Sequence, residues 1–475
     1  MKSVIYQVLP RLWGKGKFSS VDTGSFQYWK QLGVNCIWFT GIIRHASRWG
    51  DNPDKVVKGD AGSPYAITDY YDVNPYLADN PEKRMQEFEA LVARTHAAGF
   101  KVLIDFVPNH VAREYKGQLG AGDDKSVHWS ADNDFFYYPG QSLQLPASSN
   151  GYTETPAKAS GNCFTPSPGI NDWWETVKLN YCDFHTATWD KMRDIVLFWA
   201  SKGVDGFRCD MVELVPPQFM QWLIASVKAQ YPDIVFVAEV YEKEKYRMYS
   251  EEVGFDLLYD KSGLYDCLRA VTCHGASARG VTWNWQFLGD LQPRMLNFLE
   301  NHDEQRLASD FFAGSPQAGY AALAVSLLLN TAPFMLYMGQ EAGERGMQAE
   351  GFSGLDGRTS IFDWCTVPAL ENPDKEVLAR YKEALALAHE PAFAEGKTFD
   401  LNYCQDSSHF NPDRHFAFLR SDGASTYLVV ANFGPDAEVT VRIPSEALKY
   451  LNIKLVRTVY SLSVKEKDNC CLPIA

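Results

Sequence analysis

An arginine and an aspartate lie two residues apart at the end of a short apolar run, in Gly206-Phe207-Arg208-Cys209-Asp210. Side chains alternate between the two faces of a strand, so Arg208 and Asp210 share one face. Cys209 points to the other face, where we expect it to pack. A guanidinium beside a carboxylate keeps that carboxylate ionised. The pair is therefore either part of a reactive site or a buried structural ion pair, and this stretch alone leaves both interpretations open.

Polar side chains also follow three other apolar runs. These stretches are Asp105 to His110, Val237 to Val240 and Glu300 to Asp303. In a (β/α)8 barrel the reactive residues come from the C-terminal ends of several strands. Six side chains would then meet on one rim: Asp210, Glu239, Asp303, His110, His302 and Arg208. Their convergence favours a site. Asp105 lies within its run rather than at the tip, so we interpret it as a structural acid that supports the rim.

Eight apolar runs have the length and composition of buried strands. They are Val4 to Leu9, Val34 to Thr40, Lys101 to Pro108, Val204 to Asp210, Val235 to Val240, Asp256 to Tyr259, Met295 to Leu299 and Pro333 to Met338. Stretches with room for a helix separate them, which predicts βα units and a parallel sheet. We therefore predict an α/β fold of the (β/α)8 TIM-barrel type. A doubly wound sheet is the second choice, because no glycine-rich phosphate loop supports it.

Two regions depart from this alternation of predicted strands and helices. Residues 111–180 are rich in Gly, Ser, Asn, Pro and aromatic residues and lack helical periodicity, which predicts a small irregular domain inserted after the third strand. Beyond Pro391 the apolar residues alternate around a Ser421-Asp422-Gly423 turn, which predicts a C-terminal antiparallel β-sandwich. The expected domains are 1–110 and 181–391 for the barrel, 111–180 for the insertion and 392–475 for the sandwich.

Composition narrows the expected partners. The 475 residues carry a net charge of −14, which repels phosphate backbones and anionic membranes, so we expect no nucleic acid partner. The longest apolar run, Ala321 to Leu329, is too short to span a bilayer, so we expect no membrane partner. Ten cysteines without a CxxC pair, and an N-terminus without a signal-peptide pattern, favour the cytoplasm. The oligomeric state stays open.

The four polar stretches, in this order and on these strands, resemble the four signature regions of the α-amylase family of glycoside hydrolases. Tyr65-Ala66-Ile67-Thr68-Asp69-Tyr70 resembles the tyrosine-containing segment that precedes the third strand in that family. Lys178-Leu179-Asn180 resembles a further short motif near the end of the inserted domain. The resemblance extends to the barrel, the insertion and the C-terminal sandwich, and so covers essentially the whole chain.

This resemblance implies a role for each matching residue. Asp210 would be the nucleophile, Glu239 the general acid/base, and Asp303 the acid that stabilises a distorted, oxocarbenium-like sugar. Substrate binding would fall to Tyr65 stacking under the sugar ring, His110 and His302 donating to its hydroxyls, and Arg208 orienting Asp210. A nucleophile paired with an acid/base implies retention, for which the two carboxyl groups stand roughly 5–5.5 Å apart. We also expect the surroundings of Glu239 to disfavour its anion.

Some positions depart from the family pattern. Pro64 stands where the family usually has Gly, so Tyr65 has core packing as an alternative. Glu213 and Leu214 stand where many members have Lys and His, which indicates that recognition on the leaving-group side differs from that of a typical starch endo-amylase. Asn109 is a calcium ligand in many relatives, but its usual companion is missing here. We therefore expect no required cofactor and an incomplete calcium site at Asn109.

Three functions remain as hypotheses. The first is a retaining glycoside hydrolase that cleaves mainly α-1,4 bonds of an α-glucan oligosaccharide or polysaccharide, such as starch-derived glucans or maltodextrins. The second is a 4-α-glucanotransferase, in which a sugar hydroxyl intercepts the same covalent intermediate. The third is a non-catalytic carbohydrate-binding protein on the same scaffold. Such relatives often lack a catalytic acid, and here all three acids are present.

Overall fold

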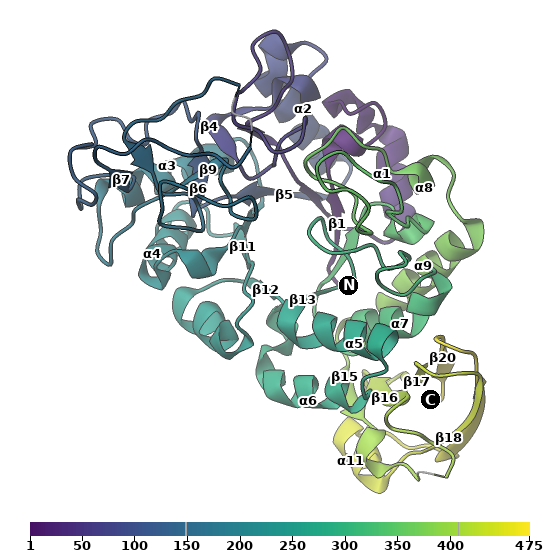
Figure 1. Ribbon diagram of the computed structural model, residues 1–475. Helices are drawn as coiled ribbons and strands as arrows, with labels where there is room; N and C mark the ends of the chain where they lie inside the picture. The colour runs from purple at the N-terminus through teal and green to yellow at the C-terminus, as the bar shows by residue number, and fades with distance from the viewer. Residues whose placement is uncertain (148–149, 407) are drawn as a thin grey trace.

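In the computed structural model, which describes residues 1–147, 150–406 and 408–475, eight parallel strands close into a barrel (Figure 1). Their order around the barrel is β1-β14-β13-β12-β11-β10-β5-β2. The strands are β1 Val4–Val8, β2 Cys36–Phe39, β5 Lys101–Phe106, β10 Gly206–Cys209, β11 Val235–Ala238, β12 Leu257–Tyr259, β13 Met295–Phe298 and β14 Phe334–Tyr337. Each lies within one of the eight predicted runs. The (β/α)8 barrel is confirmed, and the doubly wound alternative is wrong because the sheet is closed.

The strands are almost uniformly apolar because helices cover their outer faces and side chains fill the barrel. The helices are α1 Thr23–Gln31, α2 Arg84–Ala97, α3 Ala187–Ser201, α4 Pro217–Lys228, α5 Asp266–His274, α6 Arg279–Leu288, α7 Tyr320–Leu328, α8 Pro368–Glu371, α9 Lys375–Ala388, α10 Pro391–Ala394 and α11 Ser445–Leu451. Side-chain caps start two of them: Asp22 accepts from the Ser25 amide at 3.0 Å, and Asp374 accepts from the Val377 amide at 3.1 Å. Across the described residues, no helix has the length and apolarity needed to cross a membrane.

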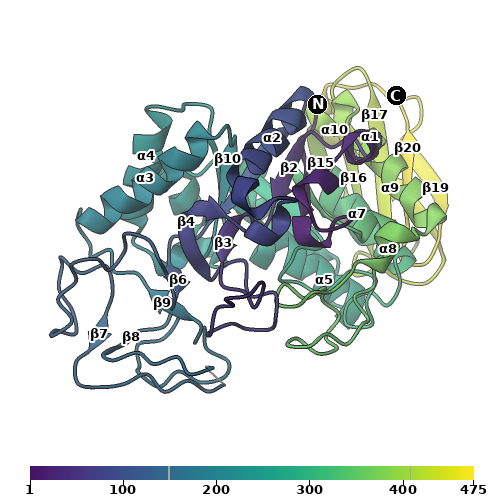
Figure 2. The ribbon, with the colours of Figure 1, turned by 90° about the horizontal axis from the view of Figure 1, so that it is seen from above.

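The region after β5 is largely irregular, as the sequence predicts. It contains β6 His110–Ala112 paired with β9 Thr176–Lys178, and β7 Tyr137–Tyr138 paired with β8 Ala157–Lys158. A buried ion pair between Arg113 and Glu154, 2.7 Å apart, ties its interior together. Figure 2 shows this region extending beyond the barrel, with β7 and β8 at its far edge. An unpredicted antiparallel pair, β3 Ile43–His45 and β4 Ile67–Val73, lies between β2 and β5 in the chain.

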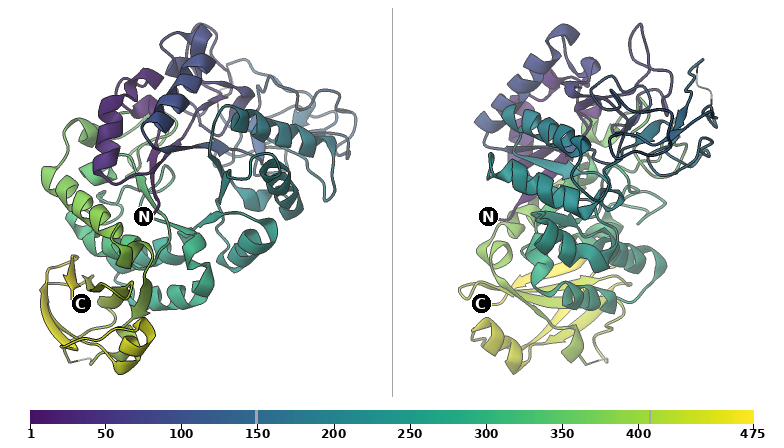
Figure 3. Two further views of the ribbon diagram at one scale, coloured as in Figure 1. Left: turned by 180° about the vertical axis from the view of Figure 1, so that it is seen from behind. Right: turned by 90° about the vertical axis from the view of Figure 1, so that its left-hand side faces the viewer.

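The C-terminal strands form two antiparallel sheets that share one apolar core (Figure 3). The larger sheet contains β15 Lys397–Asp400, β16 His415–Ser421, β17 Thr426–Asn432 and β20 Asn469–Pro473; the smaller contains β18 Ala437–Arg442 and β19 Val459–Val464. Leu419 and Val430 from the larger sheet and Val439 and Val441 from the smaller belong to this core. The predicted C-terminal antiparallel β fold is therefore confirmed. The proposed domain boundaries stay predictions.

Candidate active site

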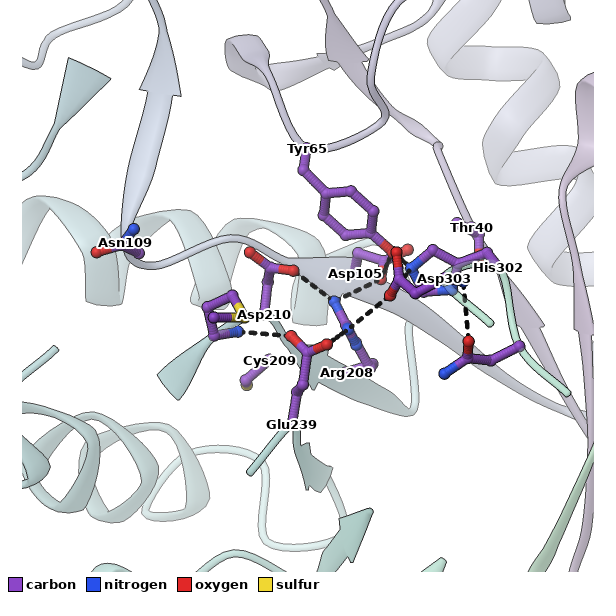
Figure 4. A network of polar contacts seen from close by, with 12 residues as sticks. Thr40, Tyr65, Asp105, Asn109, Arg208, Cys209, Asp210, Glu239, His302 and Asp303 are labelled. Atoms are coloured by element: carbon purple, nitrogen blue, oxygen red, sulfur yellow. Dashed lines mark hydrogen bonds and ion pairs between the residues drawn. The ribbon is translucent and has the colours of Figure 1, made fainter. Parts of the chain in front are cut away.

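Arg208 lies at the centre of the barrel rim, where its guanidinium joins two carboxyl groups (Figure 4). Its Nη1 donates to Asp210 Oδ1 at 2.7 Å, and its Nη2 lies 2.7 Å from Glu239 Oε1. The side chain is 1% exposed. Burial alone would lower the pKa of Arg208, but the surrounding acids raise it well above its ordinary value. A permanent buried cation therefore stands between the predicted nucleophile and the predicted acid/base.

The strand register explains why the two carboxyl groups meet. Arg208 on β10 pairs with Val237 on β11, so the residues that follow the two strands emerge side by side. Burial raises the pKa of Asp210 well above its ordinary value, Arg208 opposes this, and the negative charge of Glu239 adds to it. Arg208 thus joins the two carboxyl groups from the two neighbouring strands.

Glu239 has more hydrogen-bond donors around it than the sequence predicts. Besides Arg208, the Tyr241 hydroxyl donates to Oε1 at 2.9 Å and the Met211 amide donates to Oε2 at 2.8 Å. Met211 reaches this position with a left-handed backbone, at φ 43°. We expected surroundings that disfavour the anion, whereas these contacts all suit an accepting carboxylate. The difference arises because the loops after β10 and β11 turn their polar atoms toward Glu239.

Asp303 and His302 approach from β13. His302 Nε2 lies 3.0 Å from Asp303 Oδ2, and His302 Nδ1 lies 2.7 Å from the Gln7 side-chain nitrogen. Burial would raise the pKa of Asp303, but His302, Arg208 and Arg358 together lower it to about 2. The Asp303 side chain is 37% exposed, so this ionised carboxylate faces open space above Arg208.

Tyr65 closes the rim above these groups. Its ring stacks on His302 with centroids 5.2 Å apart and an interplanar angle of 26°, and its hydroxyl contacts His302 Nε2. The same hydroxyl donates to Asp105 Oδ1 at 3.3 Å, while the Trp38 indole donates to Asp105 Oδ2 at 3.1 Å. Tyr65 is thus both packed and part of the rim, and Asp105 lies beneath it as a supporting acid.

These residues surround one pocket of about 440 Å³. The residues that line it are Lys58, Ser63, Tyr65, His110, Asn171, Trp173, Glu175, Thr176, Asp210, Met211, Glu239, Tyr241, Asp303, Ile361 and Phe362. Five predicted site residues are among them, and Arg208 and His302 lie directly behind. Lys58, Glu175, Tyr241 and Phe362 were not predicted. A signal existed for Tyr241, which stands two residues after Glu239; the other three come from loops without a motif.

His110 lines the pocket beside Trp173, with ring centroids 5.2 Å apart. It is buried, and burial together with the charges of Lys178 and Lys58 lowers the pKa of His110 to about 3. The ring is therefore neutral over the pH range in which most proteins are stable, and a neutral ring presents one donor and one acceptor.

Asn109 lies apart from the cluster in Figure 4, and its side chain is fully engaged. Its Nδ2 donates to the Gly161 carbonyl at 2.8 Å, and its Oδ1 accepts from Lys178 Nζ, which also donates to the Leu214 carbonyl at 2.6 Å. Burial lowers the pKa of Lys178 to about 7, and either protonation state can donate to both oxygens. Among the described residues, no group of three or more His, Cys, Asp or Glu could hold a metal ion. The residues around Asn109 do not fit calcium, because an amine occupies the cation's side of the amide.

Glu213 does not reach into the pocket. Its Oε2 accepts from the Tyr241 amide at 2.8 Å and its Oε1 accepts from the Glu242 amide at 3.2 Å. The residue thus holds the loop that carries Tyr241 onto Glu239.

Comparison with known proteins gives a family match and several relatives. The family model described as "Alpha amylase, catalytic domain" matches residues 23–360. Alpha-amylase 3 of Dictyoglomus thermophilum is 24% identical over 337 residues, which are 68% of this chain and 60% of that protein. An alpha-1,4-glucan:maltose-1-phosphate maltosyltransferase of Cereibacter sphaeroides is 28% identical over 296 residues, which are 57% of this chain and 43% of that protein. The chain thus spans about half of the length of these two relatives.

Among solved structures, the ligand-free cyclic alpha-maltosyl-(1→6)-maltose hydrolase of Arthrobacter globiformis matches with a TM-score of 0.71 and 19% identity. The match covers 100% of this chain and 99% of that one. At this identity the likeness shows a shared fold.

The low pKa of His110 predicts a specific pH dependence of stability. An unfolded histidine binds its proton near pH 6.5, but the folded one does so only near pH 3, so the unfolded state takes up more protons between these values. Stability should fall as the pH drops from about 6.5 toward 3, and by pH 5 this one group should cost about 2 kcal/mol. In His110→Asn, the fall in Tm between pH 7 and pH 5 should be smaller than in the wild type. His274→Asn, at an exposed histidine, is the control. Equal falls in all three proteins would contradict the assignment.

Proposed function

Since the chain belongs to the alpha-amylase family, we propose that it is a retaining glycoside hydrolase that cleaves mainly α-1,4 bonds of starch-derived glucans or maltodextrins. The observation that carries the proposal is the single guanidinium of Arg208 in contact with both Asp210 and Glu239. One guanidinium can hold two carboxyl groups only at short range. Close spacing, roughly 5–5.5 Å, is typical of retaining enzymes, because a wider gap admits the water of an inverting reaction.

The first chemical step needs an ionised nucleophile and a protonated acid. Asp210 attacks the anomeric carbon, and Glu239 gives its proton to the leaving oxygen. The step therefore requires its proton on Glu239, while Arg208 stabilises the negative charge on Asp210. The Tyr241 hydroxyl can follow this exchange, because a phenol donates to a carboxylate and accepts from an acid.

The sugar becomes oxocarbenium-like in the transition state, and fixed charges around the pocket suit it. Asp303, with its pKa near 2, is an anion above the ring. Tyr65 stays protonated because burial and the neighbouring Asp105 raise its pKa well above the ordinary value. Neutral His110 lines the pocket, and His302 lies beside Asp303, so both rings are positioned for the sugar hydroxyls. In the second step Glu239, now deprotonated, activates the water that releases the sugar from Asp210.

The maltosyltransferase similarity favours a second candidate, a 4-α-glucanotransferase with the same residues in the same roles. A sugar hydroxyl would then replace water in the second step. The non-catalytic alternative has less support, because all three acids line the pocket. We further propose a reducing, cytoplasmic compartment, since all ten cysteines are free.

A defined substrate tests the proposal. Wild-type protein should release new reducing ends from maltoheptaose, with the α-anomer appearing first by NMR. Asp210→Asn should lose this activity by roughly 10⁴-fold or more, because the covalent step has no substitute nucleophile. Asp194→Asn, at an exposed aspartate on α3, is the control and should keep it. Full activity in Asp210→Asn, or an initial β-anomer, would refute the mechanism. Disproportionation without new reducing ends would select the transferase.

We also propose that the protein needs no structural calcium, since Lys178 Nζ occupies the cation's side of Asn109. Dialysis against EDTA should leave both Tm and activity unchanged. Lys178→Ala should lower the free energy of unfolding by about 1–3 kcal/mol, because two oxygens lose their donor. A fall in Tm on chelation, restored by calcium, would contradict the proposal.

A further inference from the structure

We propose that the pocket is closed on the side away from Glu239, so that it accepts the non-reducing end of a glucan chain and the enzyme is exo-acting. This inference rests on the proposed function, because it assigns a direction to the same site. It depends on two observations: where the barrel places Glu239, and which residues close the pocket opposite it.

The order of the strands around the barrel determines the direction in which a bound glucan chain would run. Around the barrel, β1 and β11 are separated by three strands on either side, so they stand opposite one another. Glu239 follows β11 and would protonate the leaving oxygen, which places the leaving sugars on the β11 side. In a glucosyl ring C4 lies across from C1, so the rest of the bound chain would point toward β1.

Three segments meet on the β1 side and form what we name the end wall, defined as Arg11, residues 59–62 and residues 361–362. The amides of Ala61 and Gly62 donate to the Phe362 carbonyl at 2.9 and 3.1 Å. Gly59 has a left-handed backbone, and a Cβ there would lie 2.2 Å from the same carbonyl oxygen. Residues 361–362 line the pocket, and residues 59–62 pack directly against them, so the loops after β2 and β14 are joined backbone to backbone on this side.

Arg11 holds the other two segments of the end wall together through hydrogen bonds. It follows β1 and is 7% exposed, its Nη1 donates to the Gly62 carbonyl at 3.4 Å, and its Nη2 donates to the Ile361 carbonyl. Its guanidinium also lies 5.9 Å from the centre of the Trp364 ring. One side chain thus connects the loops that follow β1, β2 and β14, which are neighbours in the barrel.

A buried ion pair between Lys58, which directly precedes residues 59–62, and Glu175 of the inserted region offers polar groups to a bound sugar. Lys58 Nζ lies 2.9 Å from Glu175 Oε2 and donates to the Asp172 carbonyl at 3.0 Å; both charged side chains are buried and line the pocket. An ammonium has three donors, so one stays available for a sugar hydroxyl. Charges in a buried site cost desolvation free energy, and a hydroxyl-rich ligand would offset part of that cost. The terminal glucose offers a free 4-hydroxyl, which a residue inside a chain lacks.

Two matched substrates test this inference. One is p-nitrophenyl maltoheptaoside, and the other is the same compound with a 4,6-O-ethylidene group on its non-reducing glucose. Chromatography of the labelled products should show cleavage of the first, with short sugars lost from its non-reducing end. The blocked compound should react at least about 100-fold more slowly, because its end cannot reach productive geometry. Equal rates for the two compounds would overturn the inference and leave hydrolysis intact.

Binding measurements distinguish a failure of the end-wall inference from a failure of the hydrolase proposal. Calorimetry on Asp210→Asn would compare maltose with 4,6-O-ethylidene maltose. Binding of maltose but not of the blocked sugar would support the end wall, and the hydrolase proposal would fail separately if the wild type released no reducing ends from maltoheptaose. Equal binding of both sugars would overturn the end wall. Binding of neither sugar would overturn the end wall, while the wild-type assay on maltoheptaose would still decide the hydrolase proposal.

A separate measurement tests whether Arg11 positions the end wall. In Arg11→Ala the wall loses its fastening, so the rate on the blocked compound relative to the unblocked one should rise by about tenfold. Arg345→Ala is the control, because Arg345 lies in the loop after β14 but is 49% exposed and pairs with Asp310, and its ratio should not change. A purely structural Arg11 would lower both rates and leave the ratio as it is. An unchanged ratio in folded Arg11→Ala would overturn the assignment.

Discussion

The site depends on one buried cation placed among acids. Isolated charges are very costly to bury, and a carboxylate in such surroundings takes up a proton unless a cation is near. Arg208 supplies that cation to Asp210 and Glu239 at 2.7 Å each, with Asp105 at 3.8 Å and Asp303 at 3.9 Å. One guanidinium thus lies within 4 Å of four acids, including the predicted nucleophile and the predicted acid/base.

The barrel also sets the direction in which a substrate would lie across this cluster of charged residues. Neighbouring parallel strands bring Arg208 and Glu239 together because their register sets the residues after β10 and β11 side by side. The closed order of strands then places β1 opposite β11. With Glu239 on the β11 side and the end wall on the β1 side, the non-reducing end of a bound glucan would point toward the end wall. The inserted region contributes Trp173 and Glu175, which complete the pocket between them.

The sequence predicts the elements whose apolar residues follow a regular pattern and the site residues whose types the reaction requires. The eight apolar runs became the eight barrel strands because a parallel sheet covered by helices needs continuous apolar stretches. Asp210, Glu239 and Asp303 could be located from their places after such runs. Lys58 and Phe362 could not, because loops carry no period and their positions depend on contacts between distant segments. The β3–β4 pair was missed for a related reason: it lies in a long polar loop, and the partly exposed charged residues Arg44, Asp69 and Asp72 interrupt its apolar residues.

The covalent role of Asp210 beside Arg208 is the central claim, and trapping its intermediate tests it most directly. A 5-fluoro-α-glucosyl fluoride should glycosylate the protein and then release slowly, because the ring fluorine destabilises the charged transition state of the second step. Peptide mass spectrometry should find one hexosyl adduct, on the peptide that contains Asp210, and none in Asp210→Asn. Turnover of the reagent without any adduct, or an adduct on another carboxylate, would contradict the account.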